Sequence, residues 1–373
     1  MSRLDLRALF AASLLLLTAV LVASCAGSPL VTEVPDSAGP KEGASQEAPP
    51  PAPVARPVVF LGADSELFAV VPDGSAARSL GVHVLNNGAG SIDKGGSAPV
   101  VSWDGRWVAA LSDDDLVVVA VADGTAHRVT HYYPEKHENT DLVKIMISGW
   151  SPDSSRLMVY VDAGLTDESG CQAPDASPTL GFYTVSVDGW ELTHQPAIEG
   201  FSGWDADGEG VVFSLYRAKD DYALMRYPFG SGDGRVLRTS QSGYGFLQLH
   251  VVGPDAVWIE HDTIVRAPLS SAAPATEASP AAPFASQQWP RLAPDRAHVA
   301  FVVKEGTTES LTLARGGTTE PATLGVCAGR CEFGWYSAET LVVSDNDGVH
   351  LVGLDGSRNT LAPNGELVPI GVH

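Results

Sequence analysis

Residues 150–161 read Trp-Ser-Pro-Asp-Ser-Ser-Arg-Leu-Met-Val-Tyr-Val. The stretch opens with an aromatic residue, continues with turn-forming Ser, Pro and Asp, and ends in an apolar, partly β-branched run. A short apolar run bounded by turn residues is typical of a buried β-strand. Residues 150–161 are therefore expected to form a tight turn that leads directly into a strand.

The same element recurs along the chain as an apolar residue, two further residues and Asp, just before an apolar run. Other copies begin at Val101, Trp204, Val252 and Leu292. A sixth begins at Trp335, with Ala338 in the position of the Asp. A period of about 47 residues, with room for four short strands, is that of a β-propeller blade. One such sheet cannot cover both of its apolar faces, so blades stack around an axis.

Asp-Gly pairs are a second marker, and they fall between the later strands of the repeats. They occur at 73–74, 123–124, 188–189, 233–234 and 355–356. Asp-Gly suits two-residue hairpin turns, in which both positions need a positive φ. Six repeats are expected near 98–130, 145–196, 199–240, 246–279, 286–325 and 331–361. Residues 58–80 supply only three strands, and Leu367-Val368-Pro369-Ile370 would complete that first blade. The sequence predicts an all-β, seven-bladed propeller closed by its C-terminal strand.

Trp150–Leu157 resembles the Trp-Ser-Pro-Asp-Gly element of the TolB-like, WD-repeat-like propeller family, and residues 102–105 and 293–295 are weaker copies. The resemblance covers residues 58–373. It implies a propeller fold, and the family includes partner-binding scaffolds and the non-catalytic propellers of some peptidases. The Tol translocation propeller itself carries an additional N-terminal α/β domain. This chain has a Pro/Ala-rich segment in that place.

The N-terminus carries an export signal. Arg3 and Arg7 precede the apolar stretch Ala8–Val22, which has the length of a signal-peptide core and is short for a bilayer span. Leu21–Cys25 resembles the lipobox of bacterial lipoproteins, which implies cleavage before Cys25 and acyl chains such as palmitate on that residue. An ordinary cleaved secretion signal is the alternative. Ala26, in place of an aspartate, favours the outer membrane in a Gram-negative cell.

Three segments follow from these observations: a lipoprotein signal peptide at 1–24, a lipidated Cys25 with a disordered tether at 25–57, and a propeller at 58–373. The tether is rich in Pro and Ala and lacks aromatic residues, so it cannot bury enough apolar surface to fold. We expect a cell-envelope, extracytoplasmic protein that is held on the membrane by acyl chains on Cys25.

Charge excludes one class of partner. The chain holds 23 Lys and Arg against 45 Asp and Glu, for a formal net charge of -22. Nucleic-acid binding depends on Lys and Arg contacts with phosphates, so no nucleic-acid partner is expected. The sequence also lacks a nucleophile elbow and phosphate-binding glycine loops. No catalytic residue, cofactor or metal site is predicted.

Cys327 and Cys331 are expected to form a disulfide in the oxidising envelope, which leaves Cys171 over, although pairing of Cys171 with either of the others stays open. Three histidines, His127, His131 and His137, cluster near acidic residues. A polar loop is the favoured interpretation, and a transition-metal site is the alternative. Periodic Trp150, Trp204 and Trp335 are expected to pack between blades, with sugar stacking as the alternative.

Long insertions are predicted at 81–97, 131–144, 163–180 and 268–285, all on one face of the ring. His131, Tyr132, Tyr133 and His137 are the candidate partner-binding residues because exposed aromatic side chains favour recognition. The expected function is a non-catalytic scaffold that binds an envelope protein or a surface polymer. The alternatives are a carbohydrate-active lyase or hydrolase, or a ligand sensor, using the central channel. An enzyme would need inward-facing ionisable residues on several innermost strands.

Overall fold

The computed structural model describes residues 56–73, 75–84, 98–112, 115–130, 144–162, 181–219, 221–230, 234–240, 246–260, 263–269, 276–277, 287–315 and 321–368. All of them lie in one compact unit, Pro53–His373. Their regular structure consists of β-strands. No helix long and apolar enough to cross a membrane occurs among these residues. Cys25 and the tether up to residue 55 lie outside the described residues.

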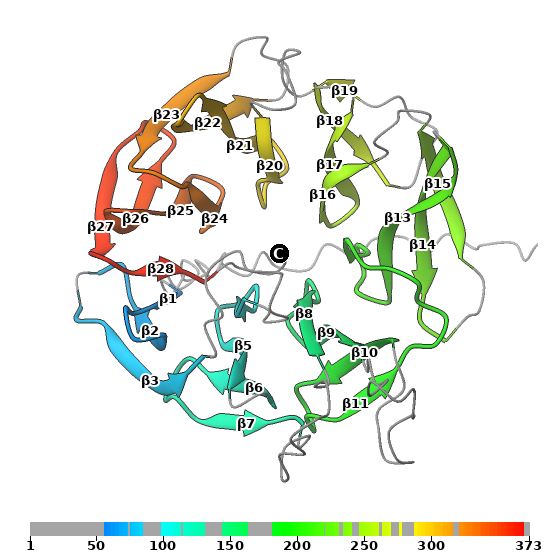
Figure 1. Ribbon diagram of the computed structural model, residues 1–373, viewed down its shortest axis with the longest axis horizontal. Coiled ribbons are helices and arrows are strands. Elements are labelled where there is room, and N and C mark those ends of the chain that lie inside the picture. The colour runs from blue at the N-terminus through cyan, green and yellow to red at the C-terminus, as the bar shows by residue number, and fades with distance from the viewer. Residues whose placement is uncertain are drawn as a thin grey trace, which may run out of the picture. The chain divides into compact units, whose positions relative to one another are not determined.

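The described strands form seven four-stranded sheets arranged radially around an axis, with the first-named strand innermost (Figure 1). Blades 1 to 3 are β28 (Glu366–Leu367), β1 (Val58–Leu61), β2 (Glu66–Val70) and β3 (Arg78–His83); β4 (Val100–Val101), β5 (Trp107–Ser112), β6 (Asp115–Ala120) and β7 (Ala126–Arg128); and β8 (Lys144–Trp150), β9 (Arg156–Asp162), β10 (Gly181–Ser186) and β11 (Leu192–His194). Blades 4 and 5 are β12 (Gly203–Trp204), β13 (Gly210–Ala218), β14 (Asp221–Pro228) and β15 (Arg235–Ser240); and β16 (Leu247–Val252), β17 (Asp255–Glu260), β18 (Thr263–Pro268) and β19 (Thr276–Glu277). Blades 6 and 7 are β20 (Gln287–Leu292), β21 (His298–Glu305), β22 (Thr308–Arg315) and β23 (Ala322–Cys327); and β24 (Glu332–Trp335), β25 (Thr340–Asp345), β26 (Gly348–Gly353) and β27 (Arg358–Ala362).

The seven-bladed propeller predicted from the repeat is confirmed. Its closure is confirmed as well: β28 pairs antiparallel with β1, joining Phe60 to Leu367 and Leu61 to Glu366. The Val368 amide then donates to the Val59 carbonyl at 3.2 Å. The tail of the chain therefore supplies the inner strand of the blade that the head of the propeller begins, which gives that blade the same four strands as the other six.

The apolar core is divided among the seams between blades. The buried apolar residues of the described chain form seven clusters, and each cluster joins two neighbouring blades. Adjacent residues of the tail point into different seams, because side chains alternate along a strand. Leu367 packs between blades 7 and 1, and Val368 packs between blades 1 and 2. Neither face of a blade is left uncovered.

The recurring Asp is a turn residue at the junction of the first and second strands of a blade. In blade 3 the Ser151 hydroxyl donates to Asp153 Oδ1 at 2.6 Å, and the Ser155 amide donates to the same oxygen at 3.1 Å. Blade 2 repeats this arrangement with Ser102 and Asp104. These bonds satisfy the polar groups of the turn locally, which explains why the motif is read so clearly from sequence.

One sequence expectation is wrong in part. Residues 268–285 are expected from the sequence to form a single insertion on the same face as the others, but β19 lies inside that stretch and pairs with β18, Val265 opposite Glu277. The stretch also begins at the other end of the ring, because Pro268 pairs with Asp255 at the turn between the first and second strands of blade 5. The outer strand of blade 5 thus has a described length of two residues within an Ala/Pro-rich segment. So short an edge strand has no detectable alternation, and composition alone suggests a loop.

Candidate functional site: a cationic cavity in the ring

A cavity of about 320 Å³ opens in the middle of the ring, where the turns between first and second strands converge. The walls are apolar and aromatic, with three basic side chains. Lining residues come from every blade: Arg56, Trp103, Trp150, Pro152, Trp204, His250, Val251, Val252, Gly253, Arg291, Leu292, Pro294, Phe333, Gly334 and Trp335. None of these described lining residues is Asp or Glu, so the cavity has the opposite sign from the molecule as a whole.

Arg56 stands at the rim, immediately before β1, and it joins two blades that flank the first. Its guanidinium donates to the Trp103 carbonyl at 2.7 Å, to the Trp335 carbonyl at 2.9 Å and to the Tyr336 carbonyl. The guanidinium lies 5.1 Å from the centre of the Tyr336 ring, and the Tyr336 hydroxyl donates back to the Arg56 carbonyl at 2.7 Å. Burial lowers the pKa of Arg56 from its ordinary value. Arg56 therefore pins the start of the propeller to blades 2 and 7.

His250 and Arg291 come from the neighbouring inner strands β16 and β20. His250 is buried, and its Nδ1 accepts the Leu292 amide at 3.2 Å, which places the ring proton on Nε2. Burial and the nearby charge of Arg291 lower the pKa of His250 well below its usual value, so the ring is neutral. Arg291 is partly exposed, because its side chain faces the cavity, but it lies deep in the channel. That burial lowers the pKa of Arg291 to about 10.

The periodic tryptophans pack between blades, and each donates its indole N–H to the backbone of the preceding blade. Trp150 donates its indole N–H to the Val100 carbonyl at 2.9 Å, and Trp204 donates to the Gly149 carbonyl at 3.0 Å. Trp335 donates to the Arg291 carbonyl at 2.9 Å. In each case the acceptor belongs to the inner strand of the preceding blade. The prediction that these rings pack between blades is confirmed by these bonds and by their near-complete burial.

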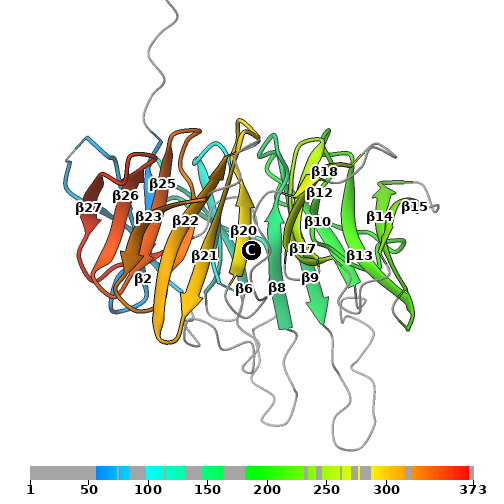
Figure 2. The same cartoon turned by 90° about the horizontal axis from the view of Figure 1, so that it is seen from above.

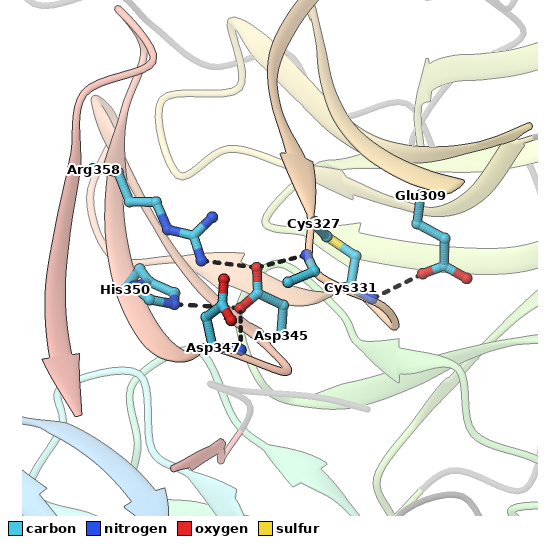
Figure 3. The surroundings of a disulfide bond; sticks show 8 residues. Glu309, Cys327, Cys331, Asp345, Asp347, His350 and Arg358 are labelled. Atoms are coloured by element: carbon cyan, nitrogen blue, oxygen red, sulfur yellow. Dashed lines mark hydrogen bonds and ion pairs between the residues drawn. A yellow bond between two sulfur atoms is a disulfide. The ribbon is translucent and has the colours of Figure 1, made fainter. Parts of the chain in front are cut away.

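A disulfide joins Cys327, the last residue of β23, to Cys331, just before β24 (Figure 3). Carboxylates from blades 6 and 7 accept backbone hydrogen bonds from the loop that the disulfide closes. Asp345 of blade 7 accepts the Ala328 amide at 3.1 Å, and Glu309 of blade 6 accepts the Cys331 amide at 2.8 Å. The disulfide and these two hydrogen bonds fix the connection from blade 6 to blade 7. Cys171 lies outside the described residues.

Asp345 is also the centre of an ion-pair network beside that loop. Arg358 donates to it at 2.8 Å, and His350 Nε2 lies 3.3 Å from its other carboxylate oxygen. The opposite ring nitrogen of His350 is 3.0 Å from the Thr360 hydroxyl. Burial raises the pKa of Asp345, but the Ala328 and Asp347 amides and the Arg358 guanidinium together lower it below its ordinary value. Asp345 is thus an ionised anchor of blade 7.

Strands β8 and β9 run between the two ends of the ring (Figure 2). In blade 3 the strand pair β8–β9 has Trp150 opposite Leu157 at the cavity end and Lys144 opposite Asp162 at the other. Six steps of a strand separate these ends by about 20 Å. Thr130, Lys144, Asp162 and Gly181 flank the insertions that follow blade 2 and lie within blade 3. Those insertions therefore begin and end opposite the cavity.

The candidate partner-binding residues His131, Tyr132, Tyr133 and His137 lie outside the described residues. His127 lies within them, at the outer strand of blade 2, where its ring stacks on Trp190 with centroids 4.6 Å apart. The described part of the chain holds no group of three or more His, Cys, Asp or Glu suited to a metal ion.

Sequence reasoning did not single out Arg56, His250 or Arg291. The only signal in the sequence is position: Arg291 directly precedes Leu292, which starts one recurring turn, and His250 lies two residues before Val252, which starts another. The enzyme alternative requires inward-facing ionisable residues on several innermost strands, and among the described lining residues β16 supplies His250 and β20 supplies Arg291. Their convergence with Arg56 depends on ring closure and is not visible in the sequence.

No family model and no curated protein sequence matches the chain. Many solved structures match its fold. One is a prolyl endopeptidase, with 15% identity, a TM-score of 0.50 and coverage of 84% of this chain and 50% of the other. Another is an acylaminoacyl peptidase bound to a chloromethyl ketone, with 16% identity, a TM-score of 0.50 and coverage of 80% and 48%. TolB from Acinetobacter baumannii matches with 13% identity, a TM-score of 0.40 and coverage of 84% and 66%. This chain spans about half the length of the two peptidases and slightly under two thirds of that TolB. At these identities the likeness concerns the propeller fold alone.

Proposed function

We propose that the chain is a lipid-anchored, extracytoplasmic binding scaffold, without catalysis, for an envelope protein or a surface polymer. The acyl chains would be attached to Cys25, and residues 26–55 would connect that anchor to the propeller. This function accounts for both the export signal and the closed, rigid ring.

The observation that carries the proposal is the position of Arg56. The segment that leads from Cys25 joins the propeller at the cavity end of the ring, where Arg56 is held by Trp103 and Trp335. The strand ends that flank the insertions, Lys144 and Asp162 among them, lie at the opposite end. The attachment point and the strand ends that flank the insertions therefore lie at opposite ends of the propeller, which leaves the insertion-bearing end free to contact a partner.

On this proposal, His131, Tyr132, Tyr133 and His137 contact the partner. Aromatic side chains contribute large contact areas at low entropic cost and dominate the energetics of many interfaces. The support is the composition of the insertion together with the position of the strand ends that flank it.

The anchor is tested by intact mass and membrane fractionation of the wild type, Cys25→Ala and Ala26→Asp. Cys25→Ala should lose the mass of the acyl chains and leave the membrane fraction. Ala26→Asp is the control, since it should keep the lipid and, in a Gram-negative host, move to the inner membrane. Unchanged mass and fractionation of Cys25→Ala would contradict lipid anchoring.

The partner surface is tested by cross-linking capture from envelope extract. Replacing residues 131–143 by a short Gly-Ser linker should abolish capture and leave the melting temperature within about 1 °C of the wild type. A matched control replaces residues 85–97, the insertion that follows blade 1. Capture that survives the first replacement, or fails equally with both, would contradict the assignment.

A ligand sensor is the second candidate, and the cavity is the observation that favours it. The enzyme alternative has a simple discriminating experiment, a screen of glycans and peptides for turnover by the purified protein. Turnover that is lost in a His250→Gln variant would replace the scaffold by an enzyme acting through the channel.

A further inference from the structure

The cavity contains a positive charge that the described protein does not neutralise. Several other arginines of the described chain have carboxylate partners, as in Arg226 with Asp205 at 2.7 Å and Arg358 with Asp345 at 2.8 Å. Arg291 differs, because no hydrogen bond or ion pair of its guanidinium occurs among the described residues, and desolvation alone governs its pKa. A buried charge without a partner costs free energy, and a bound counter-ion removes that cost.

Two hydrogen-bond donors meet at this point of the wall. Arg291 offers a planar fork of N–H groups, and the neutral ring of His250 offers its Nε2 proton, since Nδ1 is occupied by the Leu292 amide. The two side chains come from the adjacent inner strands β16 and β20, both line the cavity, and His250 is hydrogen-bonded to the amide of Leu292, the residue that follows Arg291.

The other residues that line the cavity determine which kind of ligand fits beside these donors. Arg56 uses its terminal nitrogens on three carbonyls, so it adds positive potential and little hydrogen bonding. The indole N–H groups of Trp150 and Trp335 are also occupied. What remains beside the donors is apolar: Val251, Leu292 and Phe333. One planar cationic fork beside an apolar wall matches one carboxylate, which accepts two parallel N–H bonds from arginine.

We infer that the central cavity is a binding site for a small carboxylate carried on an apolar body, with Arg291 and His250 as the groups that hold the carboxylate. The volume of about 320 Å³ admits a ligand of modest size. The inference goes beyond the scaffold function and does not rest on it, because the site lies at the opposite end of the ring from the insertions. A failure of partner capture would therefore not contradict carboxylate binding, and a failure of carboxylate binding would not contradict the scaffold function.

Binding is measured by calorimetry and thermal shift on the purified protein, with 4-phenylbutyrate as the probe and its uncharged amide as the matched control. The wild type should bind the carboxylate, and the amide should bind at least tenfold more weakly. Arg291→Met should lose at least tenfold in affinity for the carboxylate, whereas Arg217→Met, on the outside of blade 4, should not. Arg291→Lys should recover only part of the affinity, because it restores the charge without the fork.

Three results would overturn the inference: equal binding of the acid and the amide, undiminished binding by Arg291→Met, or no binding of the acid up to 20 mM. Inorganic phosphate is a further arm, and tighter binding of phosphate than of the carboxylate would overturn the choice of ligand. A second readout needs no ligand. Since Arg291 has no carboxylate partner in the part of the chain that the structure describes, Arg291→Met should melt at or above the wild-type temperature in the absence of ligand. A clear drop would mark Arg291 as a structural cation and overturn its assignment.

Discussion

Ring closure by the tail is the feature with the most direct test. Leu367 and Val368 bury their side chains in the seams on either side of blade 1, at 5% and 1% exposure. No turn connects β28 to β1, so this strand pair is held by its backbone bonds and these two side chains. We consider the double variant Leu367→Ala/Val368→Ala, which keeps the backbone and removes the apolar contacts.

The magnitude follows from the buried groups. A buried Leu→Ala change costs about 2–5 kcal/mol, and the two methyl groups lost from Val368 add about 2 kcal/mol. A total of about 4–7 kcal/mol corresponds to a factor of about 10³–10⁵ in the opening of the β28–β1 pair. Hydrogen exchange of the β1 amides should accelerate by about that factor, because the pair opens locally before the ring unfolds.

The control is Leu249→Ala/Val251→Ala in β16, an inner strand joined by a turn to its neighbour. Its side chains are similarly buried, at 9% and 5% exposure. Both variants should melt several degrees lower than the wild type, but only the tail variant should release the amides of β1. Exchange-mass spectrometry of the peptide that contains residues 58–61 reports the difference. Equal acceleration in both variants, or none in the tail variant, would refute closure by the tail.

Three further predictions concern single sites. Cys327→Ser/Cys331→Ser should lower the free energy of unfolding by about 2 kcal/mol, since the closed loop is short. Urea denaturation measures this loss, and an unchanged midpoint would contradict a stabilising role of the disulfide. Arg296, at φ +60, should gain about 0.5–1 kcal/mol on change to Gly in the same assay. Ser154→Gly, at φ +62, should gain less, because its hydroxyl accepts the Asp104 amide; a larger gain for Ser154→Gly would count against this account. The pKa of His250 is lowered by folding, so its contribution to stability is present above about pH 6.5 and is lost as the pH falls, by about 1.4 kcal/mol per pH unit. Unfolding of His250→Gln between pH 7 and 5 should show a correspondingly smaller loss, and an identical pH slope would contradict it.

Much of the architecture could be predicted because the signals are local. The Ser-x-Asp turn satisfies its hydrogen bonds within five residues. The Asp-Gly pairs mark turns correctly, but only the glycine has a positive φ at Gly124 and Gly356, and in blade 3 the positive φ falls on Trp190 instead. Burial of both faces of each blade forces β-branched and aliphatic runs at a regular spacing. The outer strand of blade 5 was missed because two residues hold no pattern.

The candidate site could not be predicted, because no local pattern marks it. Arg56 and Arg291 are far apart in the sequence, and they line one cavity only because the tail closes the ring. Whether an arginine has a carboxylate partner is likewise a property of packing: Arg226 has one and Arg291 has none among the described residues.

Except for β19, the strands follow from the amino-acid sequence, as do the number of blades and the tail that completes the first one, since turn chemistry and side-chain alternation act between near neighbours. The sign and contents of the central cavity, and the end of the ring at which Arg56 lies, depend on the folded ring. Those properties arise from side chains of all seven blades meeting at one axis, and long-range convergence leaves no trace in a period of 40–50 residues.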